Sequence, residues 1–313
     1  MRLYTQDVVK TRLTSDLLAV EKVAAVNRII QELPEFSDAV LECHLGGKSS
    51  RTDVSILLNR SIHELSASWH SHEAWQQCLK LSQILSDAHN SYRKYITEVW
   101  LEFDSEGHKL TMPIPCILVG LKPGEPIEIL SEVAAQALKI PAERIAENLQ
   151  ACLANMPANA NLLYVGRMWS RNANSLRVSI GNLAFSQVPE LLQKNGWRGA
   201  LAELDSILKQ LSRYLETMVV SFDINGSAES RIGLECYFHR ANESNPVWCN
   251  FLDYLVAENL CISHQACTLL QWPGIDYKGS SSYLRFITHI KIVIDSGQPL
   301  QAKVYLGLQQ QGL

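Results

Sequence analysis

Apolar and polar positions alternate in five successive rounds along this chain, each made of a helical stretch followed by two strand-like runs joined by a short turn. Successive side chains of a strand point to opposite faces of a sheet, so a period of two separates an apolar face from a polar one. In the fourth round Ile232, Leu234 and Cys236 share one face, whereas Arg231 and Glu235 share the other. The pattern therefore predicts hairpins with one apolar and one charged face.

The five rounds predict ten strands and a helical layer for each hairpin. The strands are expected at 39–45, 51–58, 96–103, 112–120, 162–168, 176–183, 217–224, 231–238, 286–294 and 301–308. The helices are expected at 17–31, 72–93, 126–137, 142–155, 188–194, 200–215, 246–257 and 264–270. The Ser-Gly-rich stretch 278–282 is expected to be a loop.

This order predicts an α+β fold in which helices cover one face of a mostly antiparallel sheet. The sheet could be open, or it could close into a ring; closure is favoured because it removes the exposed edge strands. We expect one domain over residues 1–313, built from repeats at about 17–70, 71–126, 127–185, 186–245 and 246–308.

Composition narrows the class of protein. Hydrophobic residues make up 47% of the 313 positions and charged residues 19%, which is enough apolar material for a large core. The net charge of -4 gives no general basic field, so we expect no nucleic-acid partner. The sequence shows no secretory signal and no apolar run near the roughly 20 residues of a membrane span, so we expect a cytoplasmic protein without a membrane partner. Its eight cysteines are scattered, as is typical of reduced structural thiols.

If the ring closes, the polar faces of the strands line its interior. Reading alternate positions gives this lumen Glu42, His44, Arg51, Asp53, Glu98, Trp100, Glu102, Tyr164, Arg177, Ser179, Asp223, Arg231, Glu235, Tyr237, His289, Lys291, Lys303 and Tyr305. In an open sheet the same face would lie against solvent. The charged face therefore indicates a ligand site only if the barrel forms.

Two short motifs accompany the fivefold order. The segment MVVSFDINGSAESRIGLECYF, residues 218–238, has a strand that ends in Phe-Asp and then a strand with Arg231 and Tyr237 at alternate positions. It is similar to the fourth hairpin of the indole prenyltransferases. Lys303 and Tyr305 are similar to a Lys-x-Tyr diphosphate clamp. Over about 17–308 the chain thus resembles the ABBA-type (PT-barrel) prenyltransferases, which have a ten-stranded antiparallel barrel inside a ring of helices.

The resemblance implies an enzyme of natural product biosynthesis that moves an isoprenyl group from an isoprenoid diphosphate to an electron-rich acceptor, either an aromatic small molecule or a peptide side chain. Basic side chains would bind the diphosphate: Arg51, Arg177, Arg231, Lys291 and Lys303. Aromatic faces would shield the allylic cation: Trp100, Tyr164, Tyr237 and Tyr305. A carboxylate would act as general base: Glu102 and Glu42 are ranked first, then Glu98.

No tightly bound cofactor and no protein metal site are expected, and the resemblance implies a prenyl diphosphate as co-substrate, which magnesium could help to hold. The indole enzymes tend to have Arg-x-Lys-x-Tyr on the fourth hairpin, whereas this chain has Gly233 and Glu235 after Arg231. Three alternatives follow: the diphosphate lies lower in the barrel, a metal holds it through Asp53, Asp223 or Glu235, or the site binds another ligand. The acidic lumen also suggests a cationic acceptor. A different class of function is an inert barrel that binds a peptide or metabolite.

Overall fold

Eleven strands form one antiparallel sheet in the computed structural model, which describes residues 1–13, 17–47, 52–58, 69, 71–105, 113–139, 142–171, 175–225, 228–239 and 241–311. The strands are β1 (Asp38–Leu45), β2 (Thr52–Leu57), β3 (Ile96–Phe103), β4 (Cys116–Leu121), β5 (Asn161–Arg167), β6 (Leu176–Leu183), β7 (Met218–Ile224), β8 (Ala228–Cys236), β9 (Gly274–Lys278), β10 (Ser281–Ile294) and β11 (Gln301–Gln311). Each strand from β1 to β8 pairs with the next, and β8 pairs with β10.

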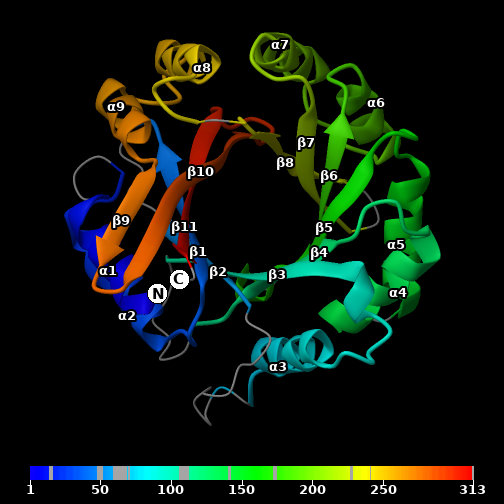
Figure 1. Ribbon diagram of the computed structural model, residues 1–313. Coiled ribbons are helices and arrows are strands. Elements are labelled where there is room, and N and C mark those ends of the chain that lie inside the picture. The colour runs from blue at the N-terminus through cyan, green and yellow to red at the C-terminus, as the bar shows by residue number, and fades with distance from the viewer. Residues whose placement is uncertain are drawn as a thin grey trace.

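The first and last strands close the sheet into a ring, which Figure 1 shows in a view down the barrel. β1 pairs with β11 from Asp38 opposite Gln309 to Leu45 opposite Ala302, and β11 pairs with β10. Ten strands complete the ring, while β9 extends beside it along the first half of β10. The predicted ten-stranded antiparallel barrel is confirmed, and the open-sheet alternative is wrong.

Helices surround the barrel on its outer side (Figure 1). They are α1 (Arg2–Thr11), α2 (Val20–Glu32), α3 (Glu73–Ser86), α4 (Ile127–Leu138), α5 (Ala142–Ala154), α6 (Gln187–Lys194), α7 (Leu201–Leu211), α8 (Pro246–Ala257) and α9 (Ser263–Gln271), with short 3₁₀ turns η2 (Arg93–Tyr95) and η3 (Trp169–Arg171). Of the helices in the described ranges, none combines the length and the apolar character needed to cross a membrane.

The apolar face of the strands packs under the helices. Val99, Leu101 and Phe103 of β3 are completely buried there, and the ring of Trp75 from α3 lies 6.0 Å from that of Phe103, centroid to centroid. Full burial of one such side chain stabilises the fold by roughly 1.5 to 3 kcal/mol. Because this face is used for the core, the polar face of each strand turns into the barrel.

The start of α8 is set by its capping residue. The side-chain oxygen of Asn245 accepts hydrogen bonds from the backbone N–H groups of Val247, at 3.0 Å, and Trp248, at 3.4 Å. Pro246 occupies the first helical turn, where its missing N–H costs nothing. The predicted helix 246–257 therefore has the predicted bounds.

Helix α3 is shorter than the predicted range 72–93. Asp87 accepts a hydrogen bond from the backbone N–H of His89 at 2.8 Å, and Asn90 accepts one from that of Tyr92 at 3.0 Å. Such local side-chain contacts compete with helical backbone bonding. The chain therefore leaves the helix before Asp87, and the last part of the prediction is wrong.

The N-terminal helix α1 and the strand β9 were not predicted. β9 and the start of β10 form a hairpin around Gly279, whose φ of +61° suits glycine. The expected loop at 278–282 is thus a tight turn between strands. Asp276 of β9 ties the hairpin to α1, because it accepts hydrogen bonds from Tyr4 and Arg12, both at 2.9 Å.

Replacing Asp276 with asparagine is expected to lower the free energy of unfolding by about 2 kcal/mol, since bonds to a charged acceptor are lost. The amides of α1 should show the largest increase in hydrogen exchange. Asp7→Asn is the matched control, because Asp7 also joins α1 to β9 but is half exposed. Equal effects of the two variants would contradict the special role of Asp276.

Candidate active site

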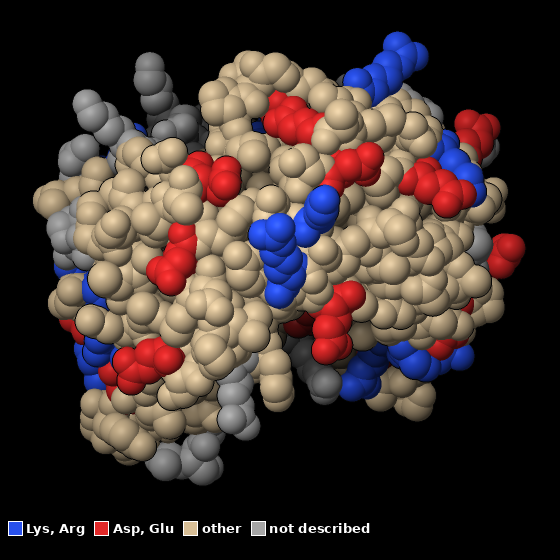
Figure 2. Space-filling model, turned by 90° about the horizontal axis from the view of Figure 1, so that it is seen from above, with Lys and Arg blue, Asp and Glu red and all other residues tan. Residues whose placement is uncertain are grey.

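Two adjoining cavities lie inside the barrel. The larger has a volume of about 260 Å³ and the smaller one of about 40 Å³. Glu102, Arg177, Lys291 and Tyr305 line both. Acidic and basic side chains are interspersed over the outer face in Figure 2, whereas the buried Glu42, Glu102, Glu235 and Lys303 line these two cavities.

Basic side chains converge on the smaller cavity from five parts of the chain. They are Arg171 from η3, Arg177 from β6, Arg231 from β8, Lys291 from β10 and Lys303 from β11. Four of these were predicted to lie together, and the structure does bring them together. Arg51, the fifth predicted cation, lies outside the described residues.

Most of these cations are already paired with an acid on a neighbouring strand. Arg177 donates two hydrogen bonds of 2.8 Å to Asp223, in a bidentate pair between β6 and β7. Lys291 lies 2.8 Å from Glu235, its cross-strand neighbour on β8. Lys303 binds Glu42 of β1. The alternating charges of the sequence thus form a set of ion pairs across strands.

Arg231 differs from the other cations. It forms no ion pair with any residue that the structure describes, and its side chain is exposed at the start of β8. It lies close enough to Lys303 for its charge to contribute to the lowered pKa of that lysine, which burial lowers most. An anion bound here would reduce the repulsion between Arg231 and Lys303, and Arg231 could bind it without first breaking an ion pair with a described residue.

The acids in the pairs remain ionised. Burial is the largest single effect and would raise the pKa of Glu235, but the neighbouring charges, led by Lys291, and the hydrogen bonds to this carboxylate together outweigh burial, and the pKa falls to about 2. Burial also opposes ionisation of Glu42, yet Lys303 and Lys291 hold its pKa well below the usual range. Both carboxylates are therefore ionised at neutral pH.

Gly233 explains how Lys291 reaches its position. A Cβ atom at Gly233 would lie 2.8 Å from Cδ of Lys291 and 2.7 Å from Oγ of Ser221. The stem of Lys291 therefore occupies the space that a side chain on residue 233 would need. The basic side chain beside Gly233 of β8 therefore comes from the neighbouring strand β10.

The larger cavity has an aromatic wall. Trp100, Tyr164, Tyr237 and Tyr305, all predicted for the lumen, line it together with His289. The ring centroids of Tyr237 and His289 are 4.7 Å apart and those of His289 and Tyr305 are 4.0 Å apart, both in stacked geometry. The aromatic faces and the basic side chains thus meet at one junction.

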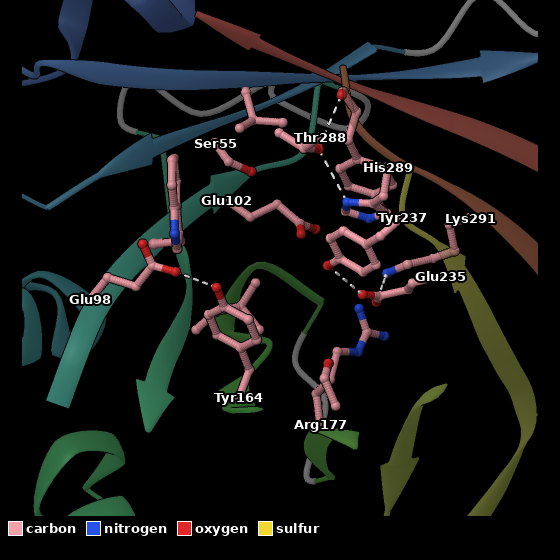
Figure 3. Close-up of a pocket in the computed structure, with 15 residues that line it drawn as sticks. Ser55, Glu98, Glu102, Tyr164, Arg177, Glu235, Tyr237, Thr288, His289 and Lys291 are labelled. Carbon is pink, nitrogen blue, oxygen red and sulfur yellow. Dashed lines mark hydrogen bonds and ion pairs between the residues drawn. The ribbon is translucent and has the colours of Figure 1, made fainter. Parts of the chain in front are cut away.

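The three predicted carboxylates differ in their partners. Glu102 binds Arg171, which also lies 2.6 Å from Asp104, and Glu42 is paired with Lys303. Glu98 has no basic partner among the described residues; it accepts a hydrogen bond from the hydroxyl of Tyr164. In Figure 3 Glu98 lies on one side of the cavity, with Glu102 in the middle.

Sequence reasoning missed Arg171, Asp104 and Ser170, which form a polar group at the end of β3. Ser170 donates a hydrogen bond to Asp104, and Arg171 binds the same carboxylate. Two of them belong to η3 and Asp104 follows β3, so none lies within a strand with a period of two. The alternation therefore carried no signal for them.

One group of potential metal ligands occurs among the described residues. Ligand atoms of Glu42, His44 and Asp53 lie within 4.8 Å of one another. However, Glu42 binds Lys303, and Asp53 accepts a hydrogen bond of 2.8 Å from the backbone N–H of Ser105. Both carboxylates are engaged, so the arrangement does not fit a resident metal ion.

Comparison with known proteins gives structural matches. Neither a family model nor a curated protein matches the sequence. The structure of PriB with product diphosphate matches with a TM-score of 0.60, 14% identity, and coverage of 96% of this chain and 95% of that chain. The structure of PriB with L-tryptophan and dimethylallyl thiolodiphosphate matches with a TM-score of 0.61 and 14% identity, over 97% of this chain and 95% of that chain. The structure of 5-dimethylallyltryptophan synthase from Streptomyces coelicolor matches with a TM-score of 0.52 and 10% identity, over 97% of this chain and 95% of that chain.

The chain has the prenyltransferase-barrel fold. The resemblance to the ABBA prenyltransferases is therefore confirmed at the level of architecture, over nearly the whole of both chains. At 10 to 14% identity the matches establish the fold of this chain.

Proposed function

We propose that this protein transfers a prenyl group from an isoprenoid diphosphate to an electron-rich acceptor. The observation that carries the proposal is the junction of the two cavities, where a cluster of cations adjoins an aromatic and acidic chamber inside a closed barrel. The matched PriB structures, which hold diphosphate or a dimethylallyl thiolodiphosphate with L-tryptophan, support the same class of reaction.

In this mechanism the smaller cavity holds the diphosphate. Arg231 and Lys303 stabilise the negative charge that grows on the leaving group as the allylic C–O bond breaks. Tyr237 and Tyr305 shield the allylic cation from water and stabilise it through their ring faces. The acceptor attacks this cation from the larger cavity, and the proton that it loses passes to a carboxylate.

Glu98 is the carboxylate that the geometry favours for this step. Glu42 and Glu102 are each bound to a cation, so an acceptor would have to compete with Lys303 or Arg171 for the carboxylate that takes its proton. Glu98 receives only the hydroxyl of Tyr164 among the described residues. This reverses the order suggested by the sequence, in which Glu102 and Glu42 came first.

The paired cations favour a second candidate function. Because Arg177, Lys291 and Lys303 already face carboxylates, much of the positive charge in the lumen is compensated. A barrel of this kind could bind a peptide or a metabolite without catalysis, or could take the diphosphate together with magnesium. These alternatives predict different ligands that raise the melting temperature: a prenyl diphosphate alone, a prenyl diphosphate with magnesium, or neither.

Dimethylallyl diphosphate is expected to raise the melting temperature, since a ligand of the native state stabilises it. Arg231→Ala should weaken this binding by about tenfold or more, because one charge-assisted contact is worth about 1.5 to 3 kcal/mol. Thermal shift and calorimetry with and without magnesium measure both effects. Arg231 has no internal partner among the described residues, so the variant should fold normally.

Arg198→Ala is the control, since Arg198 is an exposed arginine outside both cavities. It should bind the diphosphate like the unaltered protein. If neither dimethylallyl nor geranyl diphosphate changes the melting temperature, with or without magnesium, the transferase proposal fails and the binding module is favoured.

A further inference from the structure

A β-bulge in β10 turns two consecutive side chains into the larger cavity. Ile287 pairs with Leu306 and His289 pairs with Tyr305, so Thr288 is an extra residue in the ladder. In a regular strand neighbouring side chains would point to opposite faces, but here Thr288 and His289 both line the cavity. Bulges often re-aim side chains beside active sites.

The bulge fixes the tautomer of His289. Oγ1 of Thr288 donates its hydrogen bond to the backbone carbonyl of Tyr305 at 3.0 Å, because a carbonyl can only accept. The same Oγ1 lies 3.1 Å from Nδ1 of His289. With its one proton already used, the hydroxyl must accept a hydrogen bond from Nδ1–H. In a neutral imidazole the other nitrogen, Nε2, then carries a lone pair and no proton.

Nε2 of His289 is a buried acceptor without a donor. It is shielded from solvent and has no hydrogen-bond partner among the described residues. The ring is held in the stack between Tyr237 and Tyr305. Figure 3 shows it across the cavity from Glu98. A buried polar atom without a partner is costly, so its presence on a residue that lines the cavity suggests that a ligand provides the partner.

The surroundings keep this imidazole neutral. Burial lowers the pKa of His289 to about 4; the carboxylates of Glu235 and Glu42 oppose this effect and Lys291 adds to it. At neutral pH the ring therefore presents a lone pair rather than a second N–H.

We propose that Nε2 of His289 accepts a hydrogen bond from an N–H or O–H group of the acceptor molecule, and so selects acceptors that carry such a donor on an aromatic ring. The inference rests on the proposed function in that it names the class of acceptor for the same site. The aromatic wall supplies the ring contacts, and the positioning group Thr288 determines that Nε2 is the ring nitrogen of His289 that carries the lone pair.

The tautomer can be observed directly by ¹⁵N NMR of the histidine rings in the unaltered protein. At neutral pH we expect His289 to be protonated at Nδ1 and bare at Nε2. In Thr288→Val, which keeps the shape of the side chain and removes the hydroxyl, the Nε2–H form should increase. A protonated Nε2 in the unaltered protein would overturn the proposal.

Recognition of a donor can be tested with indole and 1-methylindole, which differ only in the N–H. Titration should shift the Nε2 resonance with indole and much less with 1-methylindole, and indole should bind about tenfold more tightly. His289→Phe keeps an aromatic ring in the stack and should bring the two affinities close to each other. Thr288→Val should reduce the difference in the same direction.

Equal binding of the two probes by the unaltered protein would overturn the proposal, as would binding of neither. A preference for indole over 1-methylindole that persists in both His289→Phe and Thr288→Val would also overturn it. None of these measurements requires prenyl diphosphate or turnover. Absence of transfer activity would therefore remove the proposed function, whereas only the probe and tautomer results bear on the role of His289.

Discussion

Replacing Glu98 with glutamine is expected to lower kcat for prenyl transfer by about 10²- to 10⁴-fold, the usual contribution of a positioned general base. Glutamine keeps the size of the side chain and cannot take up the proton. Binding of the prenyl diphosphate should change little, because Glu98 lines the larger cavity and not the smaller one. Single-turnover kinetics with saturating diphosphate, together with calorimetry, would separate the two effects.

Tyr164→Phe is the matched variant for this experiment. It removes the hydroxyl that donates to Glu98 and keeps the ring in the wall of the cavity. We expect a smaller loss of kcat than in Glu98→Gln. If Glu98→Gln keeps full activity while Glu102→Gln loses it, the order of the candidate bases suggested by the sequence was right and the one drawn from the ion pairs is wrong.

The buried pair of Glu235 and Lys291 is expected to make folding strongly dependent on pH on the acid side. The pKa of Glu235 is about 2 in the folded protein, below its value in the unfolded chain. Its contribution to the free energy of unfolding is therefore complete above about pH 5 and is lost as the pH falls toward 2. The shift corresponds to about 3 kcal/mol. Urea unfolding between pH 6 and pH 2 would measure this loss.

Glu235→Gln should flatten this acid limb and, at neutral pH, should destabilise the fold by about 3 to 5 kcal/mol, because Lys291 is left buried without its partner. The double variant Glu235→Gln with Lys291→Met should recover much of that loss. Glu190→Gln on the surface of α6 removes an exposed pair with Lys194 and should leave the acid limb nearly unchanged. If the free energy of unfolding falls equally with pH in the unaltered protein and in Glu235→Gln, the acid limb does not arise from Glu235.

The barrel could be predicted from the sequence because its strands keep one period over most of their length. Val178, Ile180 and Phe222 recur at alternate positions and are buried outside the ring. Arg177 and Asp223 fall on the opposite face and meet inside it. A closed ring buries the apolar face under the helices and encloses the charged face inside the barrel, so the alternation within single strands was sufficient to indicate the whole fold.

The pairing of the charges could not be predicted in the same way. Alternation shows that Lys291 faces the lumen, but only the register shows that Glu235 lies opposite it. Arg171 lies in η3, outside any strand, and no periodic signal marks it. The bulge at Thr288 did leave a trace, because Ile287 and Ile290 are three positions apart and break the period of two.

The crossing of Lys291 over Gly233 makes these two positions interdependent. A lysine introduced at residue 233 would collide with the stem of the existing one, and shortening residue 291 alone would leave Glu235 without its partner. A long side chain at residue 233 therefore requires a shorter one at residue 291, so a basic group could be transferred from β10 to β8 only by a coupled change at both positions.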